Sequence, residues 1–180
     1  AYVSSNLAIS LTVLGKRVAL VGLDVRKPML ATYMDLPNQG CLTSYIAEDS
    51  YTLEDVIIPS GITNLDILPS GVVPPNPSEL LQSEKLDQLF AELRQRYDYV
   101  IVDSAPVAMV GDSYLLQRLV DMTIYVTRAN YTQNDLIEFI NQTHMQERLP
   151  KMVAVLNGVD AKNIGYGYGY GYGHSKKNKK

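Results

Sequence analysis

Two aspartates stand directly after apolar runs that are typical of buried strands. Asp24 follows the run in VALVGLD, and Asp103 ends the run YVIVD. Parallel strands of an open α/β sheet bring their carboxyl ends to one edge, where ligands bind, so we expect the two carboxylates to lie close together. Carboxylate oxygens are preferred ligands of Mg²⁺, which also bridges to phosphate. The pair therefore predicts a site for a divalent cation and a phosphate, although a single such aspartate also serves as a helix cap or turn residue.

Two basic residues follow the first aspartate. Arg26 and Lys27 stand two and three residues after Asp24. Their side chains either face a bound phosphate or form an exposed, solvated pair, and the sequence leaves both readings open.

Alternating helices and strands are expected to position these residues. Apolar spacing predicts helices, and short β-branched runs predict buried strands. This alternation indicates an α/β fold with a doubly wound, mostly parallel sheet flanked by helices. The predicted helices lie within 3–14, 29–34, 41–49, 72–97, 112–120 and 134–149, and the predicted strands within 16–24, 64–71, 97–107, 122–129 and 151–159.

Three local features sharpen this prediction. Gly15 is expected to end the first helix as a C-cap. The proline-rich stretch within 72–97 is expected to be a loop that leads into one helix, with Ser78 and Glu79 near its start. The run 99–102 is apolar apart from the hydroxyl of its tyrosine. A continuous apolar run predicts a strand that is buried on both faces.

The last part of the chain has a different composition. Glycine alternates with tyrosine and is followed by HSKKNKK, so the stretch offers little to bury and is expected to be disordered. We expect a folded domain over 1–163 and a tail over 164–180. Such a tail is either a low-complexity linker or a set of exposed phenols that can enter another protein's active site. The phenols are those of Tyr166, Tyr168, Tyr170 and Tyr172.

Composition excludes several classes of protein. Hydrophobic residues make up 46% of the chain, as in ordinary globular domains. The net charge is −3 and the basic residues of the tail leave the rest more acidic, so we expect no nucleic-acid partner. One cysteine, Cys41, and two histidines, His144 and His174, exclude a disulfide framework and a zinc site. No run is long enough to span a membrane, and a reducing, cytoplasmic compartment is expected.

Three stretches of the chain resemble the bacterial tyrosine kinases (BY-kinases), the cytoplasmic ATPase domains of capsular and exopolysaccharide co-polymerases. They are GKRVALVGLDVRKPML, PSGVVPPNPSELLQSEKLDQLFAELRQRYDYVIVDSAPV and the tyrosine-rich tail. By this resemblance, VGLDVRKP corresponds to the Walker A′ segment and YVIVDSAP to Walker B. The resemblance implies a P-loop NTPase-like fold that uses ATP and Mg²⁺.

The resemblance also implies roles for single residues. Asp24 would be the second Walker A′ carboxylate, which binds Mg²⁺ and activates the acceptor tyrosine, and Asp103 would hold Mg²⁺ as the Walker B aspartate. Arg26 would be the basic residue of Walker A′. Asn157 stands where related deviant-Walker ATPases contact adenine, or is a turn residue. Arg128 is either near the nucleotide or a surface charge.

The chain departs from the family in two ways. Gly22 stands where many members have a further aspartate, so one carboxylate is absent. The phosphate-binding loop G-x-x-x-x-G-K-[ST] is absent too, and YVSSNLAISL resembles the segment directly after this loop in the family. We therefore expect the loop, its strand and an oligomerisation motif to precede Ala1, and this fragment to bind nucleotide poorly.

The function implied by the resemblance is an ATP-dependent tyrosine autokinase that regulates polysaccharide chain length and export. Its tail tyrosines would be phosphorylated by a neighbouring subunit of a homo-oligomer. The implied partners are a transmembrane co-polymerase region, fused or separate, and a protein tyrosine phosphatase. The domain would be cytoplasmic and tethered to the inner membrane by upstream sequence.

Two alternatives stay open on the sequence. A switch ATPase of the septum- and chromosome-positioning type shares the deviant Walker motifs but does not call for a tyrosine-rich tail. A non-catalytic scaffold, whose tail is a ligand for another enzyme, would fit Gly22 and the absent loop. Transfer of phosphate to tyrosine distinguishes the kinase from both.

Overall fold

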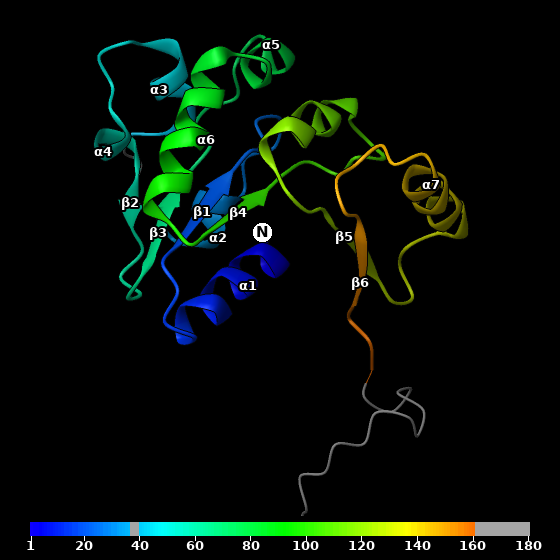
Figure 1. The fold of residues 1–180 in the computed structure, drawn as a ribbon. Coiled ribbons are helices and arrows are strands. Elements are labelled where there is room, and N and C mark those ends of the chain that lie inside the picture. Colours follow the sequence, from blue (N-terminus) through cyan, green and yellow to red (C-terminus); the bar gives the residue numbers. More distant parts are fainter. Residues whose placement is uncertain (37–39, 161–180) are drawn as a thin grey trace, which may run out of the picture.

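Helices and strands alternate along the chain in the computed structural model, which describes residues 1–36 and 40–160 (Figure 1). The tail and its four candidate acceptor tyrosines lie outside the described residues. The helices are α1 (Tyr2–Val13), α2 (Leu30–Tyr33), α3 (Leu42–Ala47), α4 (Leu53–Val56), α5 (Pro77–Leu81), α6 (Glu84–Arg96), the 3₁₀ helix η1 (Gly111–Leu119) and α7 (Asn134–Met145). The strands are β1 (Val18–Gly22), β2 (Ile58–Pro59), β3 (Leu65–Leu68), β4 (Tyr99–Asp103), β5 (Ile124–Arg128) and β6 (Val153–Asn157).

The described strands form two hydrogen-bonded sheets. The larger has the order β2-β3-β1-β4, with β1 parallel to both β3 and β4 and only β2 antiparallel. The smaller pairs β5 with β6 in parallel. The mostly parallel α/β fold is thus confirmed. Within the described residues no ladder joins β4 to β5, and the two sheets stay separate.

Helices cover both faces of the larger sheet, as a doubly wound fold requires. β1 is buried in every residue, and its side chains alternate between two apolar clusters. Ala19 and Val21 belong to the cluster that contains the inward face of α6, whereas Val18 and Leu20 pack in the cluster that contains Ala8 of α1. Burying one leucine of α6 stabilises the fold by about 1.5–3 kcal/mol. The leucines of α6 that are fully buried are Leu86, Leu89 and Leu93.

The first helix ends as predicted. Gly15 has a φ of 75°, and its N–H donates to the carbonyl oxygen of Thr12. The left-handed backbone conformation costs little free energy at this position, because glycine has no Cβ.

The segment expected to hold one helix holds two. α5 begins at Pro77, and α6 begins only at Glu84, with Ser83 between them as an N-cap. The Ser83 hydroxyl accepts a hydrogen bond from the N–H of Leu86 at 3.3 Å, which stabilises a new helix start. The prediction of one continuous helix was therefore wrong.

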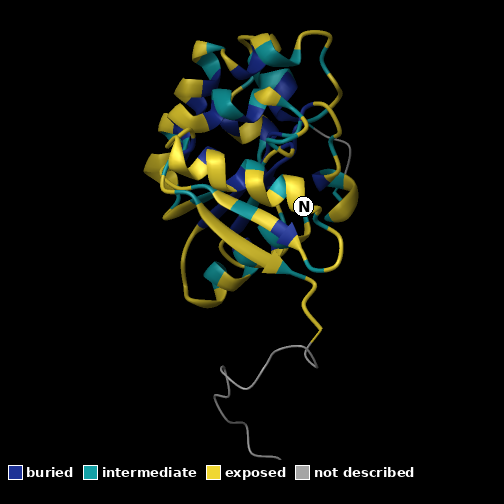
Figure 2. Cartoon of the chain, turned by 90° about the vertical axis from the view of Figure 1, so that its right-hand side faces the viewer, coloured by how far each residue is buried: buried dark blue, intermediate teal, exposed yellow. Residues whose placement is uncertain are grey.

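The burial expected for β4 is wrong as well. Tyr99 is 44% exposed and the rest of the strand is half-buried, because β4 ends the four-stranded sheet. β5 and β6 are more exposed still, and Figure 2 shows exposed residues along much of the small sheet. Val126 is 43% exposed and Leu156 is 58% exposed.

Two short elements, α4 and β2, were not predicted at all, because four and two residues are too few to show a period. Among the described residues, no helix combines the length and the hydropathy needed to cross a membrane.

Candidate functional site

The structure brings Asp24 and Asp103 together at the carboxyl ends of β1 and β4. The register of these strands pairs Gly22 with Asp103. Just beyond β1, the N–H groups of Leu23 and Asp24 donate to the carbonyl oxygen of Asp103 at 2.7 and 3.1 Å. The backbone ladder itself therefore sets the two aspartates side by side.

The carboxylate of Asp103 meets the beginning of α1. Its Oδ1 accepts hydrogen bonds from the amino group of Ala1 and from the Ser4 hydroxyl, both at 2.7 Å, and its side chain is 18% exposed. In a chain that continues before Ala1, a peptide N–H takes the place of this amino group. The positive end of the α1 dipole favours a carboxylate or a phosphate at this position.

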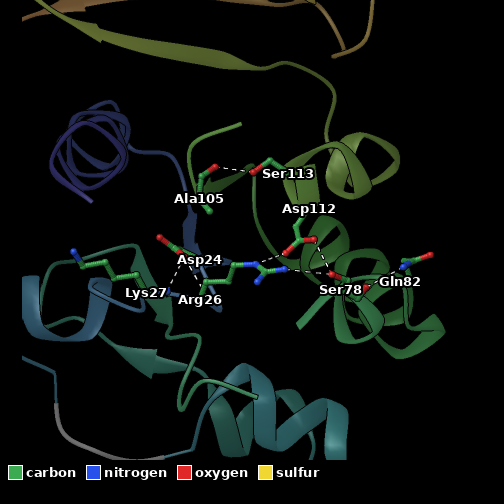
Figure 3. A network of polar contacts seen from close by, with 8 residues as sticks. All are labelled: Asp24, Arg26, Lys27, Ser78, Gln82, Ala105, Asp112 and Ser113. Carbon is green, nitrogen blue, oxygen red and sulfur yellow. Dashed lines mark hydrogen bonds and ion pairs between the residues drawn. The ribbon is translucent and has the colours of Figure 1, made fainter. Parts of the chain in front are cut away.

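Asp24 organises the turn that follows β1. Its Oδ1 accepts the N–H of Arg26 at 3.3 Å and that of Lys27 at 2.9 Å (Figure 3). This is the turn-forming role of aspartate. Oδ2 accepts no hydrogen bond from the described residues, which leaves one half-buried carboxylate oxygen for a cation or a proton.

Arg26 is held by residues from two other elements. Its Nε donates to Asp112 Oδ2 at 2.6 Å, and the hydroxyl of Ser78 donates to Asp112 Oδ1 at 2.8 Å. Figure 3 shows the side chains of Arg26 and Lys27 pointing in opposite directions, with Asp112 and Ser78 on the side of Arg26. The hydrogen bond from Arg26 holds the pKa of Asp112 below its usual value. Both basic side chains are exposed and Arg26 is also paired with Asp112, so the two readings of the basic pair stay open.

Sequence reasoning missed Asp112 and assigned Ser78 no catalytic role. The residues stand 86 and 52 positions after Arg26, and no local pattern predicts that their loops meet. An aspartate at the start of an amphipathic stretch reads as an ordinary helix cap.

The donor set suits Mg²⁺ together with a phosphate. It contains two carboxylates, one hydroxyl and a helix N-terminus, and no group of three or more His, Cys, Asp or Glu side chains in the described residues could hold a metal. Mg²⁺ is commonly bound by one or two carboxylates with water and substrate phosphate completing its shell. The residues fit such a shared site, in which Asp24 and Asp103 would supply the protein ligands.

Comparison with known proteins identifies the family. The model of the AAA domain family matches residues 1–153. The crystal structure of the VpsO kinase domain is 33% identical, with a TM-score of 0.77 over 87% of this chain and 77% of that one. The chain belongs to the bacterial tyrosine kinase family. The kinase domain of the Escherichia coli tyrosine kinase ETK is similar too, at 30% identity and a TM-score of 0.81 over 95% of this chain and 66% of that one.

The chain spans less than two thirds of the length of several of the curated relatives it matches. The tyrosine-protein kinase YwqD of Bacillus subtilis is 32% identical over 155 residues, which are 86% of this chain and 65% of YwqD. The septum site-determining protein MinD of Pyrococcus horikoshii, solved with Mg-ADP, has a TM-score of 0.66 at 19% identity over 86% of this chain and 63% of that one. The likeness to MinD shows a shared fold and nothing more specific.

Two further residues of the predicted site lie in the small sheet. Arg128 and Asn157 are paired in the β5–β6 register. Asn157 Oδ1 accepts the N–H of Gly158 at 2.9 Å, and the guanidinium of Arg128 lies 5.5 Å from the ring centre of Tyr131. Asn157 thus forms the local turn bond of the alternative reading. No hydrogen bond joins either residue to Asp24 or Asp103 in the described part of the chain.

Gly22 permits a close approach between two chain segments. A Cβ at this position would lie 3.1 Å from the backbone nitrogen of Ser70 and 3.3 Å from the side chain of Leu30. Both neighbours are buried. The absent carboxylate of the Walker A′ segment therefore coincides with tight packing in this chain.

A cavity of about 570 Å³ lies between α3 and the loop that leads into α5. Val72, Pro74 and Glu79 contribute to its wall, whereas Asp24 and Asp103 do not. The cavity is therefore separate from the paired carboxylates.

Proposed function

We propose that this chain is the catalytic domain of an ATP-dependent protein tyrosine kinase that phosphorylates its own C-terminal tyrosines. The observation that carries the proposal is the pair Asp24 and Asp103, joined through the backbone beside the first turn of α1. Two carboxylates at adjacent strand ends next to a helix N-terminus suit an Mg²⁺-bound phosphate chain. The tyrosine kinase relatives support the same reaction.

The proposal includes a strand and a phosphate-binding loop that precede Ala1 in the intact protein. In the described residues β4 has only one ladder partner, and the small sheet is separate and largely exposed. A further parallel strand at the free edge of β4 would join the sheets, and a loop from that strand to α1 would pass beside Asp103. The greater length of the relatives supports this arrangement.

The reaction moves one phosphoryl group. The phenol oxygen of the acceptor attacks the γ-phosphorus of ATP, the bond from this phosphorus to the bridging oxygen breaks, and ADP leaves with the electron pair. The Asp24 carboxylate takes the phenol proton, and Arg26 adds positive charge near the phosphates. Mg²⁺, held by Asp103 and Asp24, would supply neutralisation of the phosphate charge. Asn157 and Arg128 are proposed to contact the nucleotide from the small sheet.

Tyr166, Tyr168, Tyr170 and Tyr172 are the proposed acceptors. A tail that is long and rich in glycine suits transfer in trans between subunits of a homo-oligomer. Each phosphate adds about −1.5 to −2 charges, so several on one tail would repel neighbouring acidic domains. Phosphorylation would then separate the subunits, and a protein tyrosine phosphatase would reverse the change.

The proposed setting is the cytoplasmic side of a bacterial inner membrane. There the domain would act with a transmembrane polysaccharide co-polymerase region, fused or separate, and regulate the length and export of capsular or exopolysaccharide chains. This part of the proposal rests on the family resemblance and the tyrosine kinase relatives rather than on any described contact.

The experiment uses the protein together with the natural sequence that precedes Ala1. Intact mass is measured with and without Mg-ATP for the wild type, Asp103→Asn, and a variant with all four tail tyrosines changed to phenylalanine. We expect the mass of one to four phosphates on the wild type and none on either variant. Free phosphate without any protein phosphate would favour a switch ATPase, and a folded, ATP-binding protein that releases no phosphate and gains no mass would favour a scaffold.

A mixture tests transfer in trans. The Asp103→Asn protein keeps its tail but lacks catalysis, whereas the four-phenylalanine variant keeps catalysis but lacks acceptors. Phosphate on the Asp103→Asn chain in the mixture supports transfer between subunits. Its absence, with an active wild type, would limit the reaction to each subunit's own tail.

A further inference from the structure

Three segments that are distant in the sequence meet around one arginine. We define the Arg26 cluster as Arg26 from the turn after β1, Ser78 from α5 and Asp112 from η1 (Figure 3). The Asp112 carboxylate accepts Arg26 Nε on one oxygen and the Ser78 hydroxyl on the other. Ser78 Oγ in turn accepts Arg26 Nη2 at 3.5 Å, which closes a ring of three contacts.

The cluster leaves part of the guanidinium available. Arginine carries five N–H donors, of which the contacts above use one on Nε and one on Nη2. The described residues offer no other acceptor to Arg26, whose side chain is 45% exposed, whereas that of Asp112 is 13% exposed. Asp112 is thus the enclosed partner, and the outer N–H groups of the exposed Arg26 side chain have no acceptor among the described residues.

Both ends of the cluster are attached to the segments that carry the paired aspartates. The N–H of Arg26 is bonded to the Asp24 carboxylate. The hydroxyl of Ser113, next to Asp112, donates to the carbonyl oxygen of Ala105 at 2.6 Å, in the loop just after Asp103. The cluster therefore ties the turn after β1 to the loop after β4, the two segments that carry the carboxylates.

We propose that Asp112 and Ser78 are positioning residues that orient the Arg26 guanidinium so that its outer N–H groups bind the transferred phosphoryl group. The inference rests on the proposed kinase function. It adds α5 and η1 to the site and gives the proline-rich loop before α5 a role, because this loop sets where Ser78 lies.

A purely structural role predicts a different outcome. If Asp112 and Ser78 serve only to hold elements together, their substitution changes unfolding and leaves the chemical step intact. If they orient Arg26, the loss appears in the chemical step of a folded protein.

The test measures kcat and KM for ATP in the protein with its natural upstream sequence. For Asp112→Asn and Ser78→Ala we expect kcat to fall about tenfold or more, with a smaller change in KM and little change in the thermal midpoint. Ser78→Thr, which keeps the hydroxyl, is expected to retain most of the activity. Asp121→Asn breaks an exposed ion pair with Arg94 and serves as the matched control, with unchanged kcat.

A double substitution separates positioning from other effects. Arg26→Lys removes the group that is positioned, so Asp112→Asn in that background is expected to lower kcat by less than about threefold further. Fully additive losses would overturn the proposal. So would wild-type kcat in Asp112→Asn or Ser78→Ala, or equal losses in Ser78→Ala and Ser78→Thr.

A readout without catalysis distinguishes failure of this inference from failure of the proposed function. The Nε–H signal of Arg26 in a nitrogen-15 spectrum is expected to exchange slowly with water in the wild type and in Ser78→Thr, and faster in Asp112→Asn and Ser78→Ala. If the wild type transfers no phosphate, the kinase proposal and the phosphoryl role of Arg26 both fail. If it transfers phosphate but all four proteins exchange alike, only the positioning role fails.

Discussion

The N–H of Asp24 donates to the carbonyl oxygen of Asp103 at 3.1 Å. This hydrogen bond continues the β1–β4 ladder just beyond the end of β1. The backbone alone therefore places the two residues that carry the carboxylates next to each other. The bond uses no side-chain atom, so substitutions at these positions are expected to keep the ladder. We therefore expect that the two carboxylates can be tested one at a time without loss of the fold.

Removing either carboxylate charge is expected to weaken Mg²⁺ binding in the presence of ADP by about tenfold or more, because a charged ligand is lost. Calorimetric titration of Asp24→Asn and Asp103→Asn, each with its upstream sequence, measures the effect. Asp121→Asn is the control. Equal Mg²⁺ affinity in all of these proteins would contradict a metal role for the pair.

Restoring a side chain at Gly22 is expected to lower stability. Gly22→Ala places a Cβ 3.1 Å from the buried backbone of Ser70, and overpacking of this kind costs about 1–3 kcal/mol. Gly22→Asp adds a carboxylate to the same strain and should bind Mg²⁺ more tightly than Gly22→Ala. Denaturant unfolding measures the change in stability, and Mg²⁺ titration measures the change in affinity. An alanine variant as stable as the wild type would show that Ser70 moves aside freely.

Amide exchange is expected to be slow in β1 of the larger sheet and faster in the small sheet. β1 is buried in every residue, whereas β5 and β6 are largely exposed, so local opening should be easier in the small sheet. Inclusion of the natural upstream sequence should slow exchange in β4 and β5, which would gain a neighbouring strand. Unchanged exchange in both strands would contradict a strand between them.

Stability at alkaline pH is expected to depend on Tyr97. The pKa of Tyr97 is raised above its usual value. Burial is the largest cause, and the hydrogen bond from its hydroxyl to Asp66 Oδ2 at 2.7 Å is the second. A raised folded-state pKa contributes stability that is complete below the unfolded pKa of about 10 and is lost as pH rises further. The stability difference between wild type and Tyr97→Phe should therefore shrink by up to about 1.4 kcal/mol per pH unit above that value.

Unfolding by denaturant from about pH 9 to about pH 11 measures this difference. A difference that stays constant across the range would mean that Tyr97 ionises alike in the folded and unfolded chains. Tyr2, which is 59% exposed, provides the matched control as Tyr2→Phe.

The separation of α5 from α6 makes Ser83 a helix cap. Ser83→Ala should destabilise the chain by about 0.5–2 kcal/mol, and Ser83→Asp should restore most of the loss. Ser10, whose hydroxyl bonds to a carbonyl oxygen within α1, is the control, because its change to alanine should be close to neutral. Equal unfolding free energies for Ser83→Ala and the wild type would remove the capping role.

The sequence by itself determined the alternation of helices and strands and the position of Asp24 and Asp103 at strand ends. The spacing of apolar residues and the polar residues at strand ends can be read from short stretches of sequence. Parallel pairing brings the carboxyl ends of the strands to one edge in any such sheet. Gly15 was predictable for the same reason, since a C-cap depends on one residue's backbone freedom. The predicted roles of Arg128, Asn157 and the tail tyrosines remain predictions.

Only the tertiary structure decided how much of each strand is buried and which side chains meet Arg26. Tyr99 reads as a buried residue in its own run, but its exposure depends on whether another strand lies beside β4. Asp112 and Ser78 reach Arg26 because three loops converge at one sheet edge, and contacts across so many residues leave no trace in local periodicity. Their meeting depends on how the layers pack, and so it became visible only with the fold.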